Sequence, residues 1–305
     1  MEPRLQRRIQ RYGWDLASAE YESLWQAQLA CAHDELIACA LLAAGERVLD
    51  VASGSGLVAF RAAEAVGPHG QVVGVDLSGH MVEAARRRAE QHDMQNVRFE
   101  RMDAEQLRFP DMSFDVVLCS LGLMYMPDPE QAMREMRQVL RPGGRIVIAV
   151  WGERSRCGWS ALFPIVDAEV SSDVCPLFFR LGEGDTLACA CADAQFVAIE
   201  QHRISATLAY ANADEACSAA FLGGPVSLAW SRFDEVTRAR VRRCYVEAIA
   251  AWRGDRGYRL PGEFVIATGT VPDDRSGNQQ QQRTRIESPG QLNQQIGEQT
   301  CHSSM

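Results

Sequence analysis

The sequence predicts an α/β fold with a doubly wound, mostly parallel sheet of seven strands and helical lid insertions on its N-terminal and C-terminal sides. Three observations support this prediction. A short apolar strand pattern at 47–53 runs directly into a glycine-rich turn. Between residues 45 and 152, β-branched apolar segments alternate with helical ones, which is typical of a parallel sheet covered on both faces. Two further strand patterns, at 196–204 and 262–270, complete the sheet.

The order of the elements follows from hydrophobic periodicity and from turn residues. Helices are expected in residues 1–44, and five strands at 47–53, 71–78, 97–104, 114–120 and 145–151. The helices between those strands are expected at 57–66, at 80–92 and from Pro129 onward, where Asp128 is the N-cap and Gly143-Gly144 the end. Residues 155–190 then form a mixed connection, and 212–253 a helical insertion between the last two strands.

Composition and charge exclude several classes of function. The chain of 305 residues has a net charge of −9, which opposes binding to phosphate backbones, so we expect no nucleic-acid partner. The best apolar run, 36–44, is too short for a membrane span, and the arginine-rich N-terminus lacks the apolar segment of a signal peptide. None of the ten cysteines forms a C-x-x-C pair, so we expect reduced cysteines, no metal site and a cytoplasmic location.

The glycine-rich turn matches a dinucleotide-binding pattern. Gly54-Ser-Gly56-Leu-Val-Ala59 fits G-x-G-x-x-G/A, and the acidic Asp76 follows Gly56 by 20 positions. Glycines here allow a tight turn from strand to helix and a close approach of a ligand to the backbone. Read by this pattern alone, the chain binds NAD.

Polar side chains at the carboxyl ends of the predicted strands describe an adenosine pocket. Asp76 can accept both hydroxyls of a ribose, Asp103 can accept from an adenine amino group, and Ser120 ends the fourth strand beside the same cleft. Asp50 identifies the rest of the ligand. Its carboxylate would repel a pyrophosphate in a half-desolvated crevice, whereas it would attract the ammonium of an amino acid. A ligand with adenosine at one end and an ammonium at the other is S-adenosylmethionine.

The same stretches carry a family resemblance. "VLDVASGSG" resembles the first signature of class I S-adenosylmethionine-dependent methyltransferases, and "VVGVDLSGHMVEAA" resembles the second. The segment from Arg98 to Trp151 is similar to the rest of that domain in the ubiquinone/menaquinone-biosynthesis group (UbiE/COQ5-like, methyltransferase type 11). The resemblance covers residues 45 to 152, with four motifs in the right order and spacing. It departs from the family at Ala52-Ser53, where Gly or Cys is common.

The resemblance implies a Rossmann-like fold, S-adenosyl-L-methionine as cofactor, and methyl transfer by in-line displacement to a small or medium organic acceptor. The implied cofactor contacts are Asp50, Ala52, Ser53, Gly54 and Gly56 at the methionine part, Asp76 on the ribose, Leu77 and Met81 on the adenine face, Asp103 and Ala104 at the adenine edge, and Ser120 and Leu121 near the sulfonium. We expect four parts along the chain: a helical cap in 1–44, the cofactor-binding core in 45–152, completion of the sheet with substrate-lid insertions in 153–272, and a disordered tail in 273–305.

The acceptor side of the site is less sharply defined. Such a displacement depends on alignment and on exclusion of water, and a base is needed only if the acceptor must lose a proton. The candidate bases are His33, His80, His202, Tyr21 and Tyr125, and none is singled out as catalytic. The acceptor pocket is expected among aromatic residues outside the core sheet: Tyr21, Trp25, Phe178, Phe179, Phe221, Trp230, Trp252 and Tyr258. "LGGP" at 222–225 is a candidate hinge for a closing lid.

Three alternatives stay open at this point. A nicotinamide-dependent oxidoreductase fits the glycine pattern and Asp76 but leaves Asp50 unfavourable. A non-catalytic subunit that binds S-adenosylmethionine would keep the cofactor motifs without a working acceptor site. A thiophilic acceptor such as arsenite could be held by cysteines outside the sheet core, namely Cys157, Cys175, Cys189 and Cys191. Oxygen, nitrogen, carbon and sulfur all remain candidate acceptor atoms.

Overall fold

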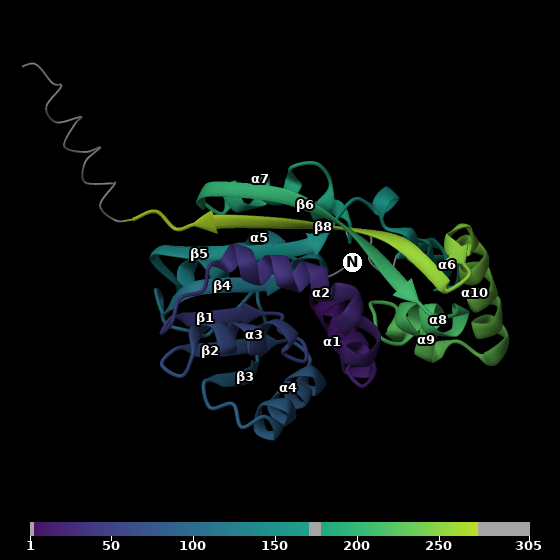
Figure 1. The fold of residues 1–305 in the computed structure, drawn as a ribbon, viewed down its shortest axis with the longest axis horizontal. Coiled ribbons are helices and arrows are strands. Elements are labelled where there is room, and N and C mark those ends of the chain that lie inside the picture. Colours follow the sequence, from purple (N-terminus) through teal and green to yellow (C-terminus); the bar gives the residue numbers. More distant parts are fainter. Residues whose placement is uncertain (1–2, 171–177, 274–305) are drawn as a thin grey trace, which may run out of the picture. The chain divides into compact units, whose positions relative to one another are not determined.

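The computed structural model describes residues 3–170 and 178–273, and over these residues the chain forms a mostly parallel sheet with helices on both faces (Figure 1). The strands are β1 (Arg47–Val51), β2 (Gln71–Asp76), β3 (Val97–Arg101), β4 (Phe114–Ser120), β5 (Leu140–Trp151), β6 (Val197–Tyr210), β7 (Arg253–Gly254) and β8 (Gly257–Thr270). Their order is β3-β2-β1-β4-β5-β8-β6, and the short β7 pairs with β8. Strands β1 to β5 are parallel, β8 is antiparallel to β5, and β6 is antiparallel to β8, which confirms the predicted fold class.

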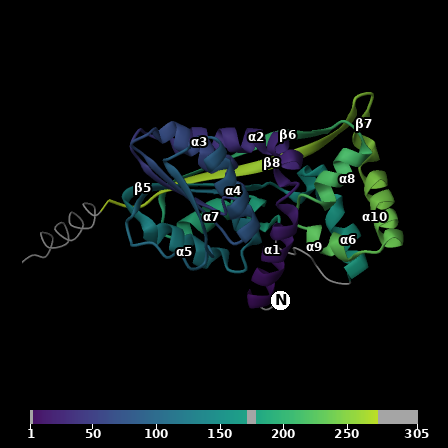
Figure 2. The same cartoon turned by 90° about the horizontal axis from the view of Figure 1, so that it is seen from below.

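Helices cover both faces of this sheet. The α-helices are α1 (Pro3–Ala17), α2 (Tyr21–Ala40), α3 (Leu57–Val66), α4 (Gly79–Gln91), α5 (Pro129–Val139), α6 (Leu162–Val170), α7 (Thr186–Asp193), α8 (Ala213–Phe221), α9 (Ser227–Arg232) and α10 (Glu235–Ala248). Short 3₁₀ turns are η1 (Leu123–Tyr125), η2 (Arg154–Arg156), η3 (Gly158–Ala161), η4 (Arg180–Gly182) and η5 (Ala250–Trp252). Helices α2, α3 and α4 lie on one face and α5 and α7 on the other, while α1 lies beside α9 (Figure 2).

Local sequence explains the central elements. Every residue of β1 after Arg47 is buried, as expected for a strand covered on both faces. Helix α4 begins where the Ser78 hydroxyl accepts a hydrogen bond from the N–H of Met81, and α5 begins where Asp128 accepts one from Gln131. Each such cap contributes about 1 kcal/mol to the helix end. Because β2 and β4 both pair in parallel with β1, their carboxyl ends lie at the same edge of the sheet.

The structure corrects several of the predicted boundaries. Strands β1, β2 and β3 end at Val51, Asp76 and Arg101, two or three residues earlier than predicted, and β5 begins at Leu140 rather than at residue 145. The helix predicted at 80–92 runs from Gly79 to Gln91. Helix α5 ends at Val139 rather than at Gly143-Gly144, and both glycines lie inside β5. A register irregularity at the start of β5 takes up the extra residues, and Gly143 has a φ of 70°, a conformation that favours glycine. Strands β6 and β8 are each longer than predicted, because they pair with each other along the whole of their length.

The predicted tail lies almost entirely outside the described residues, which end at Asp273. Within the described ranges, no helix is both long enough and apolar enough to cross a bilayer.

Candidate functional site

The glycine-rich turn follows β1 and is anchored by Asp76 at the end of β2. The Asp76 carboxylate accepts hydrogen bonds from the backbone N–H of Gly54 at 2.9 Å and of Ser78 at 2.8 Å. Gly56 begins α3 with a φ of 88°, and a Cβ there would lie 2.7 Å from the Phe60 ring. A side chain at Gly56 would therefore both strain the backbone and clash with the core.

Asp50 is a buried carboxylate on β1 without a hydrogen-bond partner. It is 1% exposed, and neither carboxylate oxygen has a partner among the described residues. Burial and, second to it, the charge of Asp76 raise the pKa of Asp50 to about 8, against a lowering by the nearby Ala59 N–H. A buried carboxylate is costly unless a cation or hydrogen-bond donors meet it. The site is thus complementary to a positively charged group.

Asp76 is already part of the fold before any ligand binds. Burial raises the pKa of Asp76 to about 6, and the hydrogen bonds from Ser78 and Gly54 oppose this rise. Each carboxylate oxygen has two acceptor sites, so both oxygens keep one for a ligand. Asp76 therefore combines the role of a turn anchor with a capacity to accept two more hydrogen bonds.

The predicted adenine side is a cavity of about 360 Å³. Its lining residues are Leu77, Arg101, Met102, Asp103, Gln106 and Arg108. Met81 is 2% exposed and is not among them, while Ala104 packs against the core cluster. Asp103 forms an ion pair with Arg7 of α1 at 3.3 Å, and Arg7 also pairs with the buried Glu105. Helix α1 therefore reaches the predicted adenine edge, a contact that the sequence did not indicate.

The ends of β1 and β4 carry strained backbone. Ala52 has a φ of 57° and Leu121 a φ of 58°, in the left-handed region that costs residues other than glycine about 1–2 kcal/mol each. A Cβ on the neighbouring Gly122 would lie 2.3 Å from the Cβ of Ala52. Ser120, the last residue of β4, directly precedes Leu121. Its buried hydroxyl has no hydrogen-bond partner among the described residues. Backbone strain of this kind clusters at functional sites. Ala52, where the sequence departs from the family pattern, is one of these strained residues.

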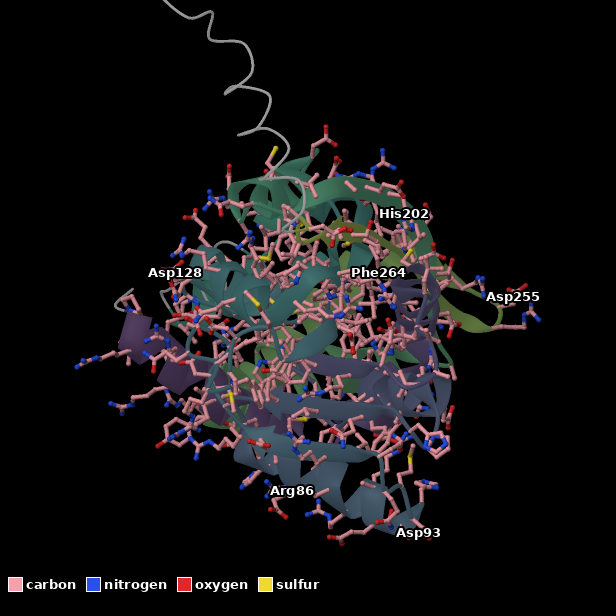
Figure 3. All side chains as sticks on the ribbon, turned by 90° about the vertical axis from the view of Figure 1, so that its left-hand side faces the viewer. Arg86, Asp93, Asp128, His202, Asp255 and Phe264 are labelled. Carbon is pink, nitrogen blue, oxygen red and sulfur yellow. The ribbon has the colours of Figure 1, made fainter. Side chains whose placement is uncertain are left out.

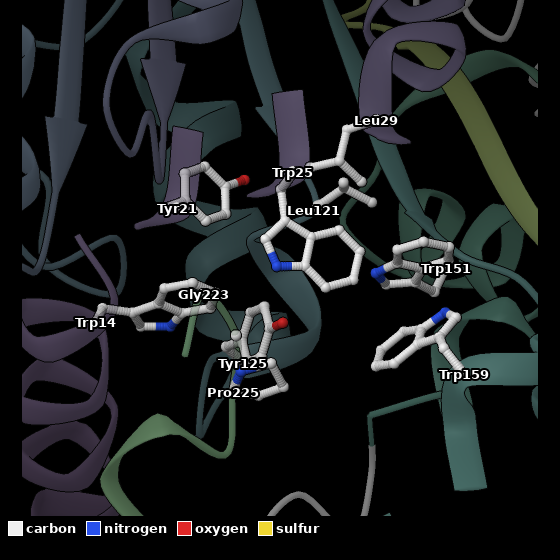
Figure 4. Close-up of a pocket in the computed structure, with 11 residues that line it drawn as sticks. Trp14, Tyr21, Trp25, Leu29, Leu121, Tyr125, Trp151, Trp159, Gly223 and Pro225 are labelled. Atoms are coloured by element: carbon white, nitrogen blue, oxygen red, sulfur yellow. The ribbon is translucent and has the colours of Figure 1, made fainter. Parts of the chain in front are cut away.

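An aromatic pocket adjoins these strand ends (Figure 4). Its lining residues are Trp14, Tyr21, Trp25, Leu29, Leu121, Tyr125, Trp151, Trp159, Gly223, Gly224 and Pro225, with no charged side chain among them. Tyr21 connects this pocket to the cofactor side: its ring lies 3.9 Å from where a Cβ of Gly54 would be. Burial raises the pKa of Tyr21, and the charges of Asp76 and Asp50 raise it further, so its hydroxyl stays protonated.

The pocket is small and contains unpartnered donors. Its cavity volume is about 30 Å³, room for one or two water molecules. The indole N–H groups of Trp25 and Trp159 are buried and have no hydrogen-bond partner among the described residues. Figure 4 shows the Trp25 indole between Tyr21 and the pair formed by Trp151 and Trp159.

Two of the eight aromatic residues predicted for the acceptor pocket line this pocket. They are Tyr21 and Trp25, whereas Phe178 and Phe179 pack on Trp159 and are absent from its lining, as are Phe221, Trp230, Trp252 and Tyr258. Phe221 and Trp230 stack on each other instead, with an interplanar angle of 12°. Four aromatic lining residues were not in the predicted set: Trp14, Trp151, Trp159 and Tyr125, the last named only as a candidate base. Trp151 had a signal, because it ends a predicted strand at the edge where the other site residues lie.

None of the three candidate histidines lines the aromatic pocket. His33 is buried, and burial lowers its pKa to about 4. A ring nitrogen of His80 lies 3.1 Å from the carbonyl oxygen of Asp15, and His202 pairs with Glu35 of α2. The cysteines proposed for a thiophilic acceptor do not gather in the pocket either. Burial raises the pKa of both Cys157 and Cys191 to about 12, Cys189 is exposed, and Cys175 lies outside the described residues.

Comparison with known proteins gives the class of this domain. Residues 42–175 match the family described as a methyltransferase domain. The chain is 38% identical over 119 residues to the demethylmenaquinone methyltransferase of Listeria welshimeri, covering 39% of this chain and 50% of that protein. It is 42% identical over 106 residues to the ubiquinone/menaquinone biosynthesis C-methyltransferase UbiE of Hahella chejuensis, covering 34% and 43%. The matched segment thus spans about half the length of these curated relatives or less.

A solved structure agrees in fold. The YcgJ protein from Bacillus subtilis superposes with a TM-score of 0.56 at 20% identity, covering 80% of this chain and 99% of that one. At this identity the likeness speaks for the fold alone. The family match and the two curated relatives confirm the predicted resemblance to class I S-adenosylmethionine-dependent methyltransferases of the UbiE-like group, and with it S-adenosyl-L-methionine as the cofactor of the domain. The nicotinamide alternative is thereby set aside.

Proposed function

We propose that this protein transfers the methyl group of S-adenosylmethionine to a small organic acceptor that enters through the aromatic pocket. The observation that carries the proposal is the buried carboxylate of Asp50, which has no partner among the described residues and lies beside the glycine-rich turn. A pyrophosphate would add negative charge there, whereas an amino-acid ammonium would neutralise the carboxylate.

The residues around the turn fit this cofactor. Asp50 would meet the ammonium, and Asp76 would accept the ribose hydroxyls at its two remaining acceptor sites. The backbone of Ala52 to Gly56 would approach the methionine part, with Ser53 among them. Leu77 and Asp103 would form the adenine side, and Ser120 with Leu121 the side nearest the aromatic pocket. The structure does not support the adenine contacts expected of Met81 and Ala104, because neither residue lines the cavity on that side. Arg7 pairs with Asp103, so α1 would lie against the predicted adenine edge and cover part of it.

The chain's own residues align the reactants and exclude water. When bound, S-adenosylmethionine supplies a methyl group on a sulfonium whose leaving thioether is neutral. Leu121 lines the aromatic pocket and directly follows Ser120, so the acceptor would be held next to the cofactor side of the cleft. The neutral Tyr21 hydroxyl can donate a hydrogen bond but cannot act as a base near neutral pH. Catalysis here would therefore rest on alignment and on the dry aromatic walls.

The cofactor part is tested by calorimetric titration with S-adenosylmethionine and, separately, with NAD. We expect binding of the first and none of the second, and a loss of affinity of about 10-fold or more in Asp76→Asn, since one acceptor oxygen is replaced by a donor. Asp93→Asn, an exposed carboxylate at the end of α4, is the matched control (Figure 3). NAD binding without a signal from S-adenosylmethionine would contradict the proposal.

The lining of the pocket favours one class of acceptor. An indole N–H is a donor only, so the unpartnered N–H groups of Trp25 and Trp159 call for acceptor atoms on the ligand. The remaining walls are aromatic and carry no charge, which suits stacking on a flat ring. We therefore propose an aromatic or quinol-type ring bearing oxygen substituents. The names of the two curated relatives, which both refer to menaquinone, support the same class.

The acceptor class is tested with Trp25→Phe, which keeps an aromatic ring and removes the donor. With a panel of hydroxylated aromatic rings as acceptors, we expect KM for the accepted compound to rise about 5- to 10-fold while cofactor affinity stays unchanged. Formation of S-adenosylhomocysteine with any acceptor excludes a non-catalytic binding subunit. A variant with unchanged KM would contradict a role for this N–H, and turnover of only aliphatic amines would contradict the acceptor class.

A further inference from the structure

A second group of ligand-type side chains lies far from the cofactor site, between α2 and the edge strand β6. Glu35 and Cys39 are four residues apart on α2, so they lie on one face of the helix. His202 on β6 faces them: its Nε2 lies 2.9 Å from the Glu35 Oε1, and the Cys39 Sγ lies 3.7 Å from the same oxygen (Figure 3 labels His202). One donor atom from each residue lies within 4.8 Å of the other two.

We propose that Glu35, Cys39 and His202 bind a divalent metal ion of the zinc type, which clips α2 to β6. A tetrahedral zinc ion with ordinary bond lengths to sulfur, nitrogen and oxygen places its donor atoms about 3.3–3.6 Å apart. The distances of 2.9 Å and 3.7 Å lie on either side of this range, and the third, from the Cys39 Sγ to the His202 Nε2, is within 4.8 Å, so the side chains would have to shift to surround the ion. A thiolate with an imidazole and a single carboxylate selects zinc-like ions over calcium or magnesium.

Glu200 is a candidate fourth ligand on the same strand. It precedes His202 by two positions on β6, so both side chains lie on one face of that strand. Its carboxylate is not among the three donor groups within 4.8 Å of one another, so it would have to turn toward the ion. The charges of Glu35 and Glu200 both act on Cys39, and this negative charge favours a bound cation. On metal binding Cys39 would release its proton, and His202 would keep one only on Nδ1.

The clip would act on the fold rather than on the reaction. Near its other end α2 is already tied to β6, because Gln28 exchanges two hydrogen bonds with the backbone of Ala209, at 2.7 Å and 3.0 Å. The metal would add a second tie near residue 39. Since Tyr21 and Trp25 of the same helix line the aromatic pocket, the ion would help to fix the helix that forms one wall of that pocket. Spacing along the sequence could not reveal this site, because two ligands come from α2 and the third from a strand more than 160 residues later.

The proposal is tested by titrating the full chain, freed of metal with a chelator, with Co²⁺ and then with Zn²⁺. We expect one equivalent of cobalt to give thiolate-to-cobalt charge-transfer absorption and the intense visible bands of a four-coordinate site, both lost on adding zinc. Zinc should also raise Tm by about 5 °C, because it binds the folded state alone. Neither readout needs the cofactor, so failure here is separate from failure of the proposed activity.

Variants assign the ligands. Cys39→Ser and His202→Gln should each lose the cobalt spectrum and the zinc-induced rise in Tm, and Glu200→Gln should weaken zinc binding about tenfold or more. Cys31→Ser, an exposed cysteine on the same helix, should bind metal as the unaltered protein does. No cobalt absorption in the unaltered chain overturns the proposal. So does a spectrum that survives in both Cys39→Ser and His202→Gln, since another set of the ten cysteines then holds the ion.

Discussion

Replacement of Asp50 by asparagine should stabilise the free protein and weaken cofactor binding at the same time. The carboxylate is buried, has no partner among the described residues and has a pKa of about 8 against an ordinary value of 3.8. The folded chain therefore binds one proton more than the unfolded chain at every pH between these values. Stability falls by about 1.4 kcal/mol for each pH unit in that window, with no penalty below it and a constant one above.

The magnitude at pH 7 follows from that slope. Three pH units above the ordinary value, the penalty amounts to about 4 kcal/mol. Asparagine carries no charge and keeps the shape of the side chain, so Asp50→Asn removes most of this penalty and should gain about 2–4 kcal/mol in the free energy of unfolding. The gain should grow between pH 6 and pH 8, above the pKa of about 6 of Asp76.

Cofactor binding should move in the opposite direction. An ammonium beside Asp50 requires the carboxylate form, so binding at pH 7 should release close to one proton from the unaltered protein and none from the variant. Loss of a charged hydrogen bond should weaken binding about 10- to 100-fold. Calorimetric titration in buffers of different ionisation enthalpy measures both quantities, and denaturant unfolding at pH 6, 7 and 8 measures the stability.

Asp115→Asn is the matched control. This carboxylate lies on β4, where it accepts from the Arg47 N–H and pairs with Arg141, and its pKa is lowered although burial opposes this. Its contribution to stability is present above the ordinary pKa and is lost as the pH falls, so the variant should be less stable at pH 7 with unchanged cofactor affinity. Equal stability of Asp50→Asn and the unaltered protein from pH 6 to 8, or unchanged cofactor binding, would refute the reasoning.

Two further substitutions probe the surroundings of the cofactor side. Arg7→Ala leaves the buried Glu105 without its ion pair and frees Asp103. We expect the free energy of unfolding to fall by about 1–3 kcal/mol, and cofactor association, measured by stopped-flow tryptophan fluorescence, to become faster. Slower association would contradict a covering role for α1. Gly122→Ala places a Cβ 2.3 Å from that of Ala52, so Tm and cofactor affinity should both fall. A second change, Ala52→Gly, should restore part of each. If it restores neither, the clash with Ala52 is not the cause of the loss.

Much of the sheet and of the cofactor side is predictable because their signals are local. The bounds of α3 and β4 agree with the prediction residue for residue, since a buried apolar strand and a glycine-bounded helix are defined by their own residues. Strand ends in a parallel sheet meet at one edge, so Asp50, Asp76 and Ser120 can be grouped from the order of strands and helices alone.

The rest depends on pairings between distant segments. Strand β6 extends to Tyr210 because β8 pairs with it, and nothing in residues 205–210 alone requires a strand. The contact of Arg7 with Asp103 joins α1 to the loop after β3, across almost a hundred residues. Trp14 and Trp159 read equally well as core or surface residues until the helices that carry them are placed. The metal ligands of α2 and β6 are hidden for the same reason.

Gly223 lies in the wall of the pocket through which we propose that the acceptor enters. A cavity of about 30 Å³ is too small for an aromatic ring, which needs about 150 Å³, so part of the wall must move. The LGGP segment was expected to act through backbone freedom, yet neither of its glycines has a positive φ. Gly223 serves close approach instead, because a Cβ there would lie 3.0 Å from the Trp25 indole.

Alanine at this position should therefore push the wall outward. For Gly223→Ala we expect faster hydrogen exchange across 222–226 and a changed acceptor KM with unchanged cofactor affinity. Gly224→Ala is the control, since a Cβ there meets its nearest neighbours at 3.7–3.9 Å, an ordinary contact. If both variants exchange alike, the packing of Gly223 on Trp25 does not hold the pocket closed, and the opening must be sought in the other wall, where α1 carries Trp14.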